Sequence, residues 1–233
     1  NAISSKSSGD SSSSNAYGIE GYDLNGIEIL GNSFDIESGL LSYGMSLNNP
    51  QNMAVHDNSI YAMGCAAVGI DLTGSAGGSL NIYENTVKIT GGDFSDIHAI
   101  GTVGNYLVSI ADDLDACVYD NAFIVSNSNP LNAAESKLNQ NRFLVNEETI
   151  DVLFDSADGI RTISPYSNIK SGDILVFDSL GNAAFVLDIP LTVKSSDDDV
   201  VLRNIEFDLT GVSGFTFDHV ILNNSLGGSA ISI

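Results

Sequence analysis

Tryptophan is absent from the 233-residue sequence, and lysine and arginine together number only 8 against 30 aspartates and glutamates, a formal net charge of −22. Such a negative field repels nucleic acid and anionic membranes, so we expect neither as a partner. No run approaches the roughly 18 apolar residues of a membrane-spanning helix, so none is predicted. Without tryptophan a dedicated carbohydrate-stacking cleft is disfavoured, although 8 tyrosines remain for such contacts.

One short phrase recurs along the chain: an aliphatic residue, two positions, an asparagine, one position and another large apolar residue. The asparagines of these copies are Asn32, Asn58, Asn85, Asn121, Asn141 and Asn224, and a looser copy surrounds Asn204. Successive asparagines from 32 to 141 are 26, 27, 36 and 20 residues apart. A repeat of this length with one strand–bend–strand phrase per period is typical of a solenoid.

The alternation of apolar residues breaks at each asparagine, as it must if the strand bends there and keeps both apolar neighbours inside. Asparagine tolerates the left-handed backbone that such a bend needs better than any residue except glycine. In stacked coils these side chains would form a ladder of hydrogen-bonded amides. The pattern therefore predicts an all-β, parallel β-helix in which the asparagines are structural and bind no ligand.

A second phrase with a small central residue precedes the asparagines, as Tyr17-Gly18-Ile19, Tyr43-Gly44-Met45, Val68-Gly69-Ile70 and His98-Ala99-Ile100. The arm from this phrase to the next asparagine lengthens along the chain, whereas the return arm stays nearly constant. Insertions therefore accumulate on one side, at residues 74–79 and 104–116. One-sided insertions in solenoids often mark the face that contacts partners.

The predicted organisation has three parts. Residues 1–16 are serine-rich and are expected to be a linker or an irregular coil, and residues 17–146 form β-helix coils. Residues 147–233 begin with a cap-like, short amphipathic helix near 147–156 and continue as further coils with an open C-terminal end. Either the chain is cut from a longer array, or one solenoid has an irregular middle. In both cases we expect the open end to stack on another copy or on an adjacent repeat.

Few residues offer chemistry. Asp112, Asp113 and Asp115 lie on the longer insertion and are candidate Ca²⁺ ligands or an acid/base pair, with a solvated acidic loop as the alternative. The same alternative applies to residues 197–199. The three histidines, His56, His98 and His219, have no metal-ligand spacing, and His56 is expected to face outward. Asn223 begins the one N-glycosylation sequon, Asn223-Asn224-Ser225, and should point outward if Ile221 points inward.

The two cysteines, Cys65 and Cys117, occupy different places relative to the nearest repeat asparagine and so do not stack directly. We expect buried thiols that behave as small apolar residues, with a disulfide as the alternative.

Residues 174–224 carry apolar strands before Asn182, the run Asp188-Ile189-Pro190-Leu191-Thr192-Val193, then Val201-Leu202-Arg203-Asn204-Ile205-Glu206-Phe207, and Gly214-Phe215-Thr216-Phe217. This stretch resembles the large adhesin-like surface proteins of methanogenic archaea, which are built from right-handed parallel β-helix repeats of the pectate-lyase-like type. The resemblance covers most of residues 17–233. It implies a right-handed solenoid in an extracellular, cell-surface or cell-wall protein used for attachment or surface layering, and it brings no catalytic motif.

The expected function is that of a non-catalytic structural or adhesive surface module without a cofactor, with Ca²⁺ as the one ion to test. Its partners would be further copies or repeats stacked head to tail, and host or cell-surface glycans. One alternative is a polysaccharide lyase or glycoside hydrolase of the pectate-lyase-like fold, with Asp71 and Asp113 as a conceivable acid pair and Arg142 as the nearest basic residue. A virus or phage fibre is the other.

Overall fold

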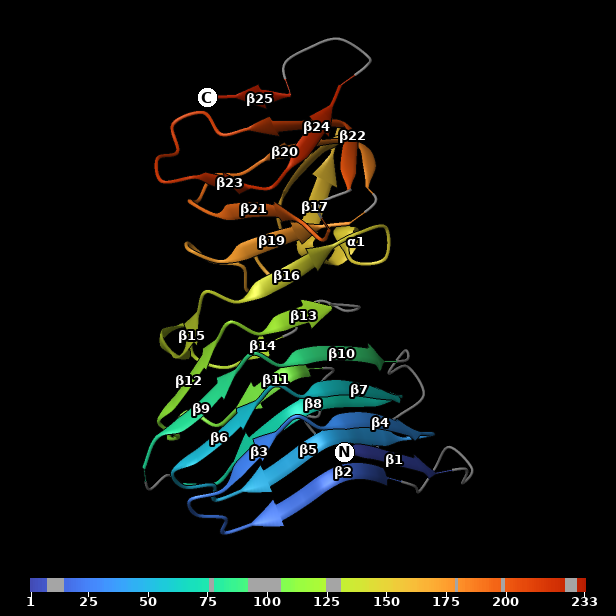
Figure 1. Cartoon of the computed structure of the whole chain (residues 1–233), viewed down its shortest axis with the longest axis vertical. Coiled ribbons are helices and arrows are strands. Elements are labelled where there is room, and N and C mark those ends of the chain that lie inside the picture. The colour runs from blue at the N-terminus through green and yellow to red at the C-terminus, as the bar shows by residue number, and fades with distance from the viewer. Residues whose placement is uncertain are drawn as a thin grey trace. The chain divides into compact units, whose positions relative to one another are not determined.

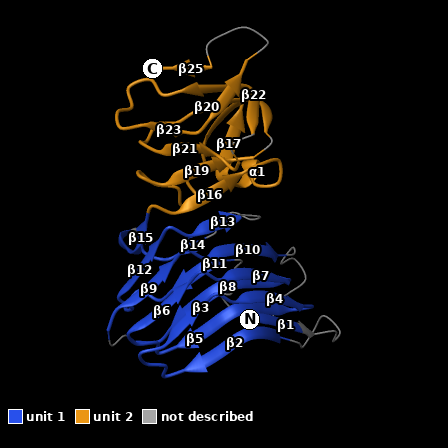
Figure 2. Ribbon diagram, in the orientation of Figure 1, with its two compact units in different colours: residues 1–139 blue, residues 140–233 orange. Residues whose placement is uncertain are grey.

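The computed structural model describes residues 1–7, 15–75, 78–91, 106–124, 131–178, 180–197, 200–224 and 230–233. The chain divides into two compact units, residues 1–139 (unit 1) and residues 140–233 (unit 2), shown in different colours in Figure 2. Strands in both units pair mainly in parallel, which confirms the predicted all-β class and parallel β-helix. No helix in these described ranges has the length and apolar character needed to span a membrane.

Unit 1 is a stack of coils that each give one strand to each of three parallel sheets (Figure 1). Sheet 1 contains β1 (Ala2–Ser7), β4 (Ser33–Ser38), β7 (Ser59–Gly64), β10 (Thr86–Gly91) and β13 (Ala122–Ile124). Sheet 2 contains β2 (Asn15–Tyr22), β5 (Leu41–Asn48), β8 (Ala66–Thr73), β11 (Tyr106–Ile110) and β14 (Leu131–Asn132). Sheet 3 contains β3 (Glu28–Leu30), β6 (Met53–His56), β9 (Leu80–Tyr83), β12 (Ala116–Tyr119) and β15 (Leu138–Asn139), the last preceded by a 3₁₀ helix, Glu135–Lys137.

The serine-rich start of the chain belongs to the solenoid. Residues 2–7, expected to lie in a linker or irregular coil, form β1, which pairs with β4 in register from Ala2–Ser33 to Ser7–Ser38. Residues 8–14 lie outside the described part of the chain. Composition misled the prediction because serine side chains suit the solvent face of a strand as well as a loop.

Close packing between sheets explains the glycine of the second phrase. A Cβ atom on Gly44 would lie 2.4 Å from Ile60 Cγ2 and 2.5 Å from the carbonyl oxygen of Gly69. Gly18 and Gly69 are equally crowded, so these three positions admit only glycine without a shift of backbone. The fourth expected copy, at 98–100, lies outside the described residues, and Tyr106 and Val108 pair with Val68 and Ile70 instead.

Unit 2 alternates between two sheets. Four strands form one sheet: β16 (Arg142–Val145), β19 (Ile174–Phe177), β21 (Thr192–Ser195) and β23 (Thr216–Asp218). The other contains β17 (Phe154–Ala157), β18 (Ile160–Ile163), β20 (Gly181–Val186), β22 (Val201–Asp208) and β24 (Ile221–Asn223), and β25 (Ile231–Ser232) also pairs with β22. Unit 2 begins at residue 140, so β16 belongs to it, although the sequence suggested a boundary at 146.

The predicted cap-like helix is α1 (Ile150–Leu153), a single turn with Ile150 and Leu153 buried. The Asn146 side chain accepts the N–H groups of Glu148 and Thr149 before the helix begins. After α1 the chain forms the antiparallel pair β17–β18 around Asp158 and Gly159, which both have positive φ. Two such residues in a row are typical of the tight turns that join hairpin strands. This hairpin gives the parallel sheet an antiparallel edge.

Phenylalanine rings fill the centre of unit 2. Phe177, Phe185 and Phe207 contact one another with ring centroids 5.3–5.6 Å apart. Phe154 lies against Phe185, and Phe217 lies against Phe207. Most of these pairs are edge-to-face, which is the favoured geometry for packed aromatic rings.

Candidate functional site

The buried asparagines of unit 1 form a continuous row of hydrogen bonds at the corner before sheet 1. The amide of Asn32 donates to Asn58 Oδ1, Asn58 to Asn85, and Asn85 to Asn121, at 3.2, 3.0 and 2.9 Å. Each Oδ1 also accepts the backbone N–H of the preceding asparagine. Since Asn58, Asn85 and Asn121 are at most 2% exposed, the row closes the interior of the unit.

The bend itself is not made by these asparagines, contrary to the expectation from their left-handed tendency. The left-handed residue is the one before each of them: Gly31, Asp57, Glu84, Asp120 and Gln140 have φ of 63°, 54°, 55°, 54° and 47°. The asparagine contributes its side-chain amide, which donates to two backbone carbonyls as well as to the next asparagine. Asn85, for example, donates to Val55 O and Tyr83 O. Because the preceding residue takes the left-handed conformation, the chain changes direction before the asparagine, and the asparagine side chain points into the corner.

Two further residues occupy equivalent places that the repeat phrase did not reveal. Asn1 donates from its amide to Asn32 Oδ1 at 3.2 Å, so it extends the row of unit 1. In unit 2, Asp173 takes the place beside Asn141 and accepts the Asn141 N–H at 2.9 Å, after left-handed Gly172. Asp173 is 1% exposed, and burial raises its pKa to about 6 although the N–H groups of Lys170 and Asn141 favour its ionised form.

Asn204 and Asn224 do not belong to this corner. Asn204 lies inside β22, in register with Asn224 after β24, and its amide donates to Asn182 Oδ1 at 3.0 Å. Here Asn182 and Asn204 themselves have positive φ, of 55° and 53°. Unit 2 thus has a second, more exposed asparagine row, and the apolar residue displaced after Asn204 was the sign that its register differs.

The outer face of sheet 3 carries a stack of rings. His56, Tyr83 and Tyr119 occupy the same register on β6, β9 and β12, next to Leu30 on β3. The His56 and Tyr83 rings are 4.6 Å apart at 5°, and the Tyr83 and Tyr119 rings are 5.1 Å apart at 7°. Both broad faces of Tyr83 are therefore covered by neighbouring rings, whereas His56 and Tyr119 each stack on Tyr83 with one face.

His56 is held by two carboxylates from different coils. Its Nε2 lies 2.9 Å from Glu28 Oε1 and its Nδ1 lies 2.7 Å from Asp57 Oδ2. These two hydrogen bonds, with Glu28 the stronger cause, raise the pKa of His56 above its ordinary value, whereas desolvation works against the charged form. With both ring nitrogens engaged by carboxylates, His56 leaves no nitrogen open to a substrate. The prediction that it faces outward agrees with its register beside inward Val55, although neighbours leave it only 9% exposed.

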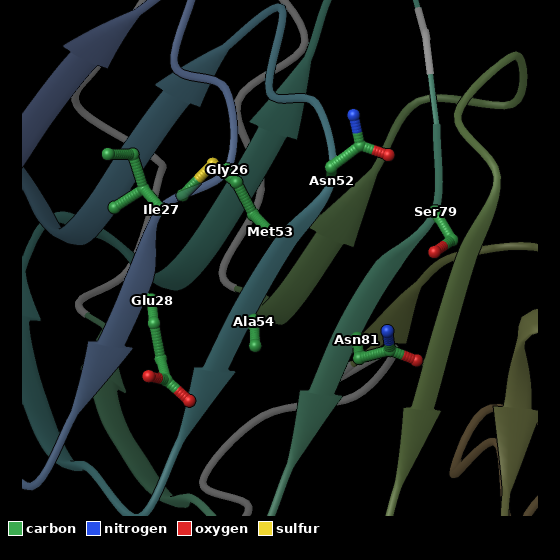
Figure 3. Close-up of a pocket in the computed structure, with 8 residues that line it drawn as sticks. All are labelled: Gly26, Ile27, Glu28, Asn52, Met53, Ala54, Ser79 and Asn81. Carbon is green, nitrogen blue, oxygen red and sulfur yellow. The ribbon is translucent and has the colours of Figure 1, made fainter.

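Beside this stack lies a groove of about 260 Å³ on the outer face of β3, β6 and β9 (Figure 3). Glu28, Ala54 and Asn81 line its length in one register across the three strands. Ile27, Asn52 and Ser79 line the end before the strands begin. The side chains of Glu28 and Asn81 stand on either side of the small Ala54 in Figure 3.

The proposed Ca²⁺ ligands lie in a tight turn between β11 and β12. Asp112, Asp113 and Asp115 are exposed, and within the described ranges no group of three or more His, Cys, Asp or Glu is arranged to hold a metal ion. Lys137 directs its ammonium to the carbonyl oxygens of Ala111 and Asp112, at 2.9 and 2.8 Å. A protein cation therefore already occupies two backbone carbonyl oxygens of this loop. Of residues 197–199, only Asp197 is described, and it is exposed.

Asp71 lies on the outer face of sheet 2 and hydrogen-bonds Ser109 rather than pairing with Asp113. Burial raises the pKa of Asp71, and burial together with the charge of Asp71 raises the pKa of nearby Tyr43 to about 12. Arg142, the basic residue considered for a lyase, is on β16 of unit 2.

Both cysteines are free thiols. Cys65 is half-buried and donates to Gly39 O, and Cys117 is exposed on the outer face of sheet 3, so the expectation of two buried thiols is wrong. Its position follows from register: Val118 points inward at 0% exposure and its neighbours point out.

Asn223 is exposed on β24, as N-glycosylation requires, but for a different reason from the one expected. Ile221 is itself 46% exposed, and Leu222 is the residue in register with buried Leu202. Ser225 of the sequon and His98 lie outside the described part of the chain, and His219 is exposed beside Asp218.

No family model, curated protein or solved structure matches this chain.

Proposed function

We propose that the chain is a non-catalytic structural or adhesive module of an extracellular surface, cell wall or filament. The observation that carries this proposal is the asparagine row of unit 1, in which the buried amides hydrogen-bond to neighbouring coils and to carbonyl groups of their own bends. Such a row stabilises an extended stack and leaves those side chains nothing to offer a substrate. The resemblance of residues 174–224 to adhesin-like surface proteins points the same way.

The polar groups that suggested chemistry support the same proposal. Both ring nitrogens of His56 are engaged by carboxylates, and Asp173 is engaged by two backbone N–H groups. Asp71 contacts a serine hydroxyl instead of a second carboxylate. Glycoside hydrolysis needs two carboxyl groups facing one bond, and no such pair arises from the candidates considered.

The proposed partners are further copies or repeats stacked along the solenoid, and surface glycans. Among the described strands, β3 pairs on one side only, with β6. Ile27, just before this edge strand, is 41% exposed, and Leu30, on the strand, is 49% exposed. An edge strand with apolar neighbours is a ready template for another strand.

The test is the oligomeric state of the purified chain, measured by electron microscopy and light scattering with and without Ca²⁺. Growth of rods is expected, and Leu30→Lys should suppress it, because a lysine at an edge opposes strand addition. The matched control is Ile160→Lys, which changes an apolar residue of similar exposure (44%) on β18, a strand that is paired on both sides. A degradation assay on uronic-acid and neutral polysaccharides completes the test, and turnover of any of them would overturn the non-catalytic assignment.

A further inference from the structure

The groove beside the ring stack has a shape set by one small side chain. Glu28, Ala54 and Asn81 are neighbours across β3, β6 and β9. Neighbouring strands are about 4.8 Å apart, so the carboxylate and the amide stand about 10 Å apart with only a methyl group between them. The result is a notch one strand wide, bounded by two hydrogen-bonding groups (Figure 3).

The polar groups around this notch are available. Across the described ranges, neither the Asn81 amide nor the Ser79 hydroxyl makes a hydrogen bond within the protein, and both line the groove. Glu28 uses Oε1 for His56 and has a second carboxylate oxygen. An amide, a hydroxyl and a carboxylate oxygen together provide donors and acceptors, which suits a ligand whose own groups are hydroxyls. The exposed side chain of Ile27 adds an apolar contact at the end of the groove.

Charge narrows the class of ligand. The two carboxylates that contact His56, those of Glu28 and Asp57, outnumber the one positive charge that the imidazole can carry, and both Asp57 and Glu84 are exposed acids beside the ring stack. Two exposed acids next to the notch, in a chain of net charge −22, repel an anionic sugar. A neutral sugar meets no such repulsion. Because both faces of Tyr83 are occupied in the stack, recognition in the groove rests on hydrogen bonds to hydroxyl groups and not on stacking against this ring.

We propose that this groove binds a neutral hexose unit of a polysaccharide, with Glu28 and Asn81 hydrogen-bonding its hydroxyl groups across Ala54 and Ser79 contacting it from the loop. The proposal deepens the adhesive role and rests on it. His56 acts as a positioning residue, since it fixes one oxygen of Glu28 and leaves the other directed to the ligand. Ala54 sets specificity by leaving the space that the sugar occupies.

The experiment is an NMR titration of the full 233-residue chain. The probes are mannotetraose, cellotetraose and laminaritetraose as neutral oligosaccharides and trigalacturonate as the acidic one. At least one neutral probe should shift the signals of Glu28, Ala54 and Asn81, and trigalacturonate should bind at least tenfold more weakly.

Two variants and a control locate the site. Ala54→Gln fills the notch and should weaken binding at least tenfold, and Asn81→Ala should weaken it severalfold. Ser33→Gln adds the same side chain to the exposed face of β4 and should leave binding unchanged. Because all three positions are on the solvent side of strands, retained thermal unfolding confirms that each variant folds.

Each other outcome overturns the proposal. Absence of binding by every neutral probe at 10 mM, a preference for trigalacturonate, or unchanged binding by Ala54→Gln would remove the groove as a neutral-sugar site. Such a failure is distinct from failure of the proposed function. Rod formation by the Ala54→Gln variant would preserve the structural role without the groove, whereas polysaccharide turnover would remove the non-catalytic role.

Discussion

The buried asparagine row of unit 1 and the second asparagine row of unit 2 place an amide at a bend in two different ways. In unit 1 the asparagine lies at a buried corner, the preceding residue is left-handed, and three sheets surround an interior closed by the amide row. In unit 2, Asn182 and Asn204 are themselves left-handed, lie in a more exposed row within one of two sheets, and surround an interior of phenylalanine rings. The difference teaches that a repeat phrase specifies an amide at a bend, whereas the register of the coil decides whether that amide is buried.

The largest effect should come from removing a central amide of the buried row. Asn85→Ala leaves Val55 O and Tyr83 O without their donor and Asn58 without its acceptor. Buried polar groups without partners cost about 1–3 kcal/mol each, so the expected loss is about 3–5 kcal/mol in free energy of unfolding. Chemical denaturation followed by tyrosine fluorescence measures it.

A substitution at Asn204, in the second asparagine row of unit 2, tests the contrast between the two rows. Asn204→Gly removes one exposed amide contact but relieves a left-handed backbone, so it should change the free energy of unfolding by less than about 1 kcal/mol. Asn85→Gly should not recover stability relative to Asn85→Ala, because the left-handed residue in unit 1 is Glu84. Equal costs for the substitutions at 85 and 204 would contradict the comparison.

A second test concerns the closeness of the sheets. Gly44→Ala places a methyl group 2.5 Å from the carbonyl oxygen of Gly69, and backbone must move, so we expect a loss of about 2–3 kcal/mol. Gly181→Ala in unit 2 meets nothing closer than 3.5 Å and should be tolerated within about 0.5 kcal/mol. Thermal unfolding of both variants measures these losses. Unchanged stability of Gly44→Ala would show that the packing between sheets 1 and 2 can accept a methyl group at this position.

Asp173, the buried acid of unit 2, should give a marked pH dependence of stability in the acid range, as its large pKa shift indicates. The pKa of Asp173 is raised from 3.8 to about 6, so between these values the folded state holds a proton that the unfolded state has lost. Stability therefore falls as pH rises from about 4 to 6, by on the order of 2 kcal/mol, and stays lower above that. Asp173→Asn should abolish this fall, measured as free energy of unfolding at several pH values. A fall of unchanged size in the variant would assign it to other groups.

The smallest effect belongs to His56 in unit 1. Its folded pKa is raised by Glu28 and Asp57, so its contribution is complete below the unfolded value of 6.5 and is lost as pH rises through the folded value. Glu28→Gln should lower the pKa of His56, measured by NMR titration of the imidazole. Because solvent screens the exposed Glu28 carboxylate, the loss of stability near neutral pH should be less than about 1 kcal/mol. Gln substitution at exposed Glu84 is the matched control and should leave the His56 titration nearly unchanged.

The sequence predicted much of the fold because coil length and apolar period repeat along the chain. The spacings of 26, 27 and 36 residues reappear as the hydrogen-bonded partners of the asparagine row. The crowding at Gly18, Gly44 and Gly69 accounts for the second phrase. Candidate site residues were harder to predict. Glu28 and His56 lie 28 residues apart, and only the strand register makes them neighbours on β3 and β6.

The sequence by itself determined the class of fold, the repeat and most inward residues of unit 1, because periodic burial leaves its pattern in local sequence. The tertiary structure alone decided which asparagines share a corner, that Asn1 and Asp173 stand in equivalent places, and that Ala54 opens a notch between Glu28 and Asn81. The physical reason is that each of these features depends on register between coils. Register is fixed by turn geometry and insertion length summed over a whole coil, and a change of one residue reverses which side chains face out.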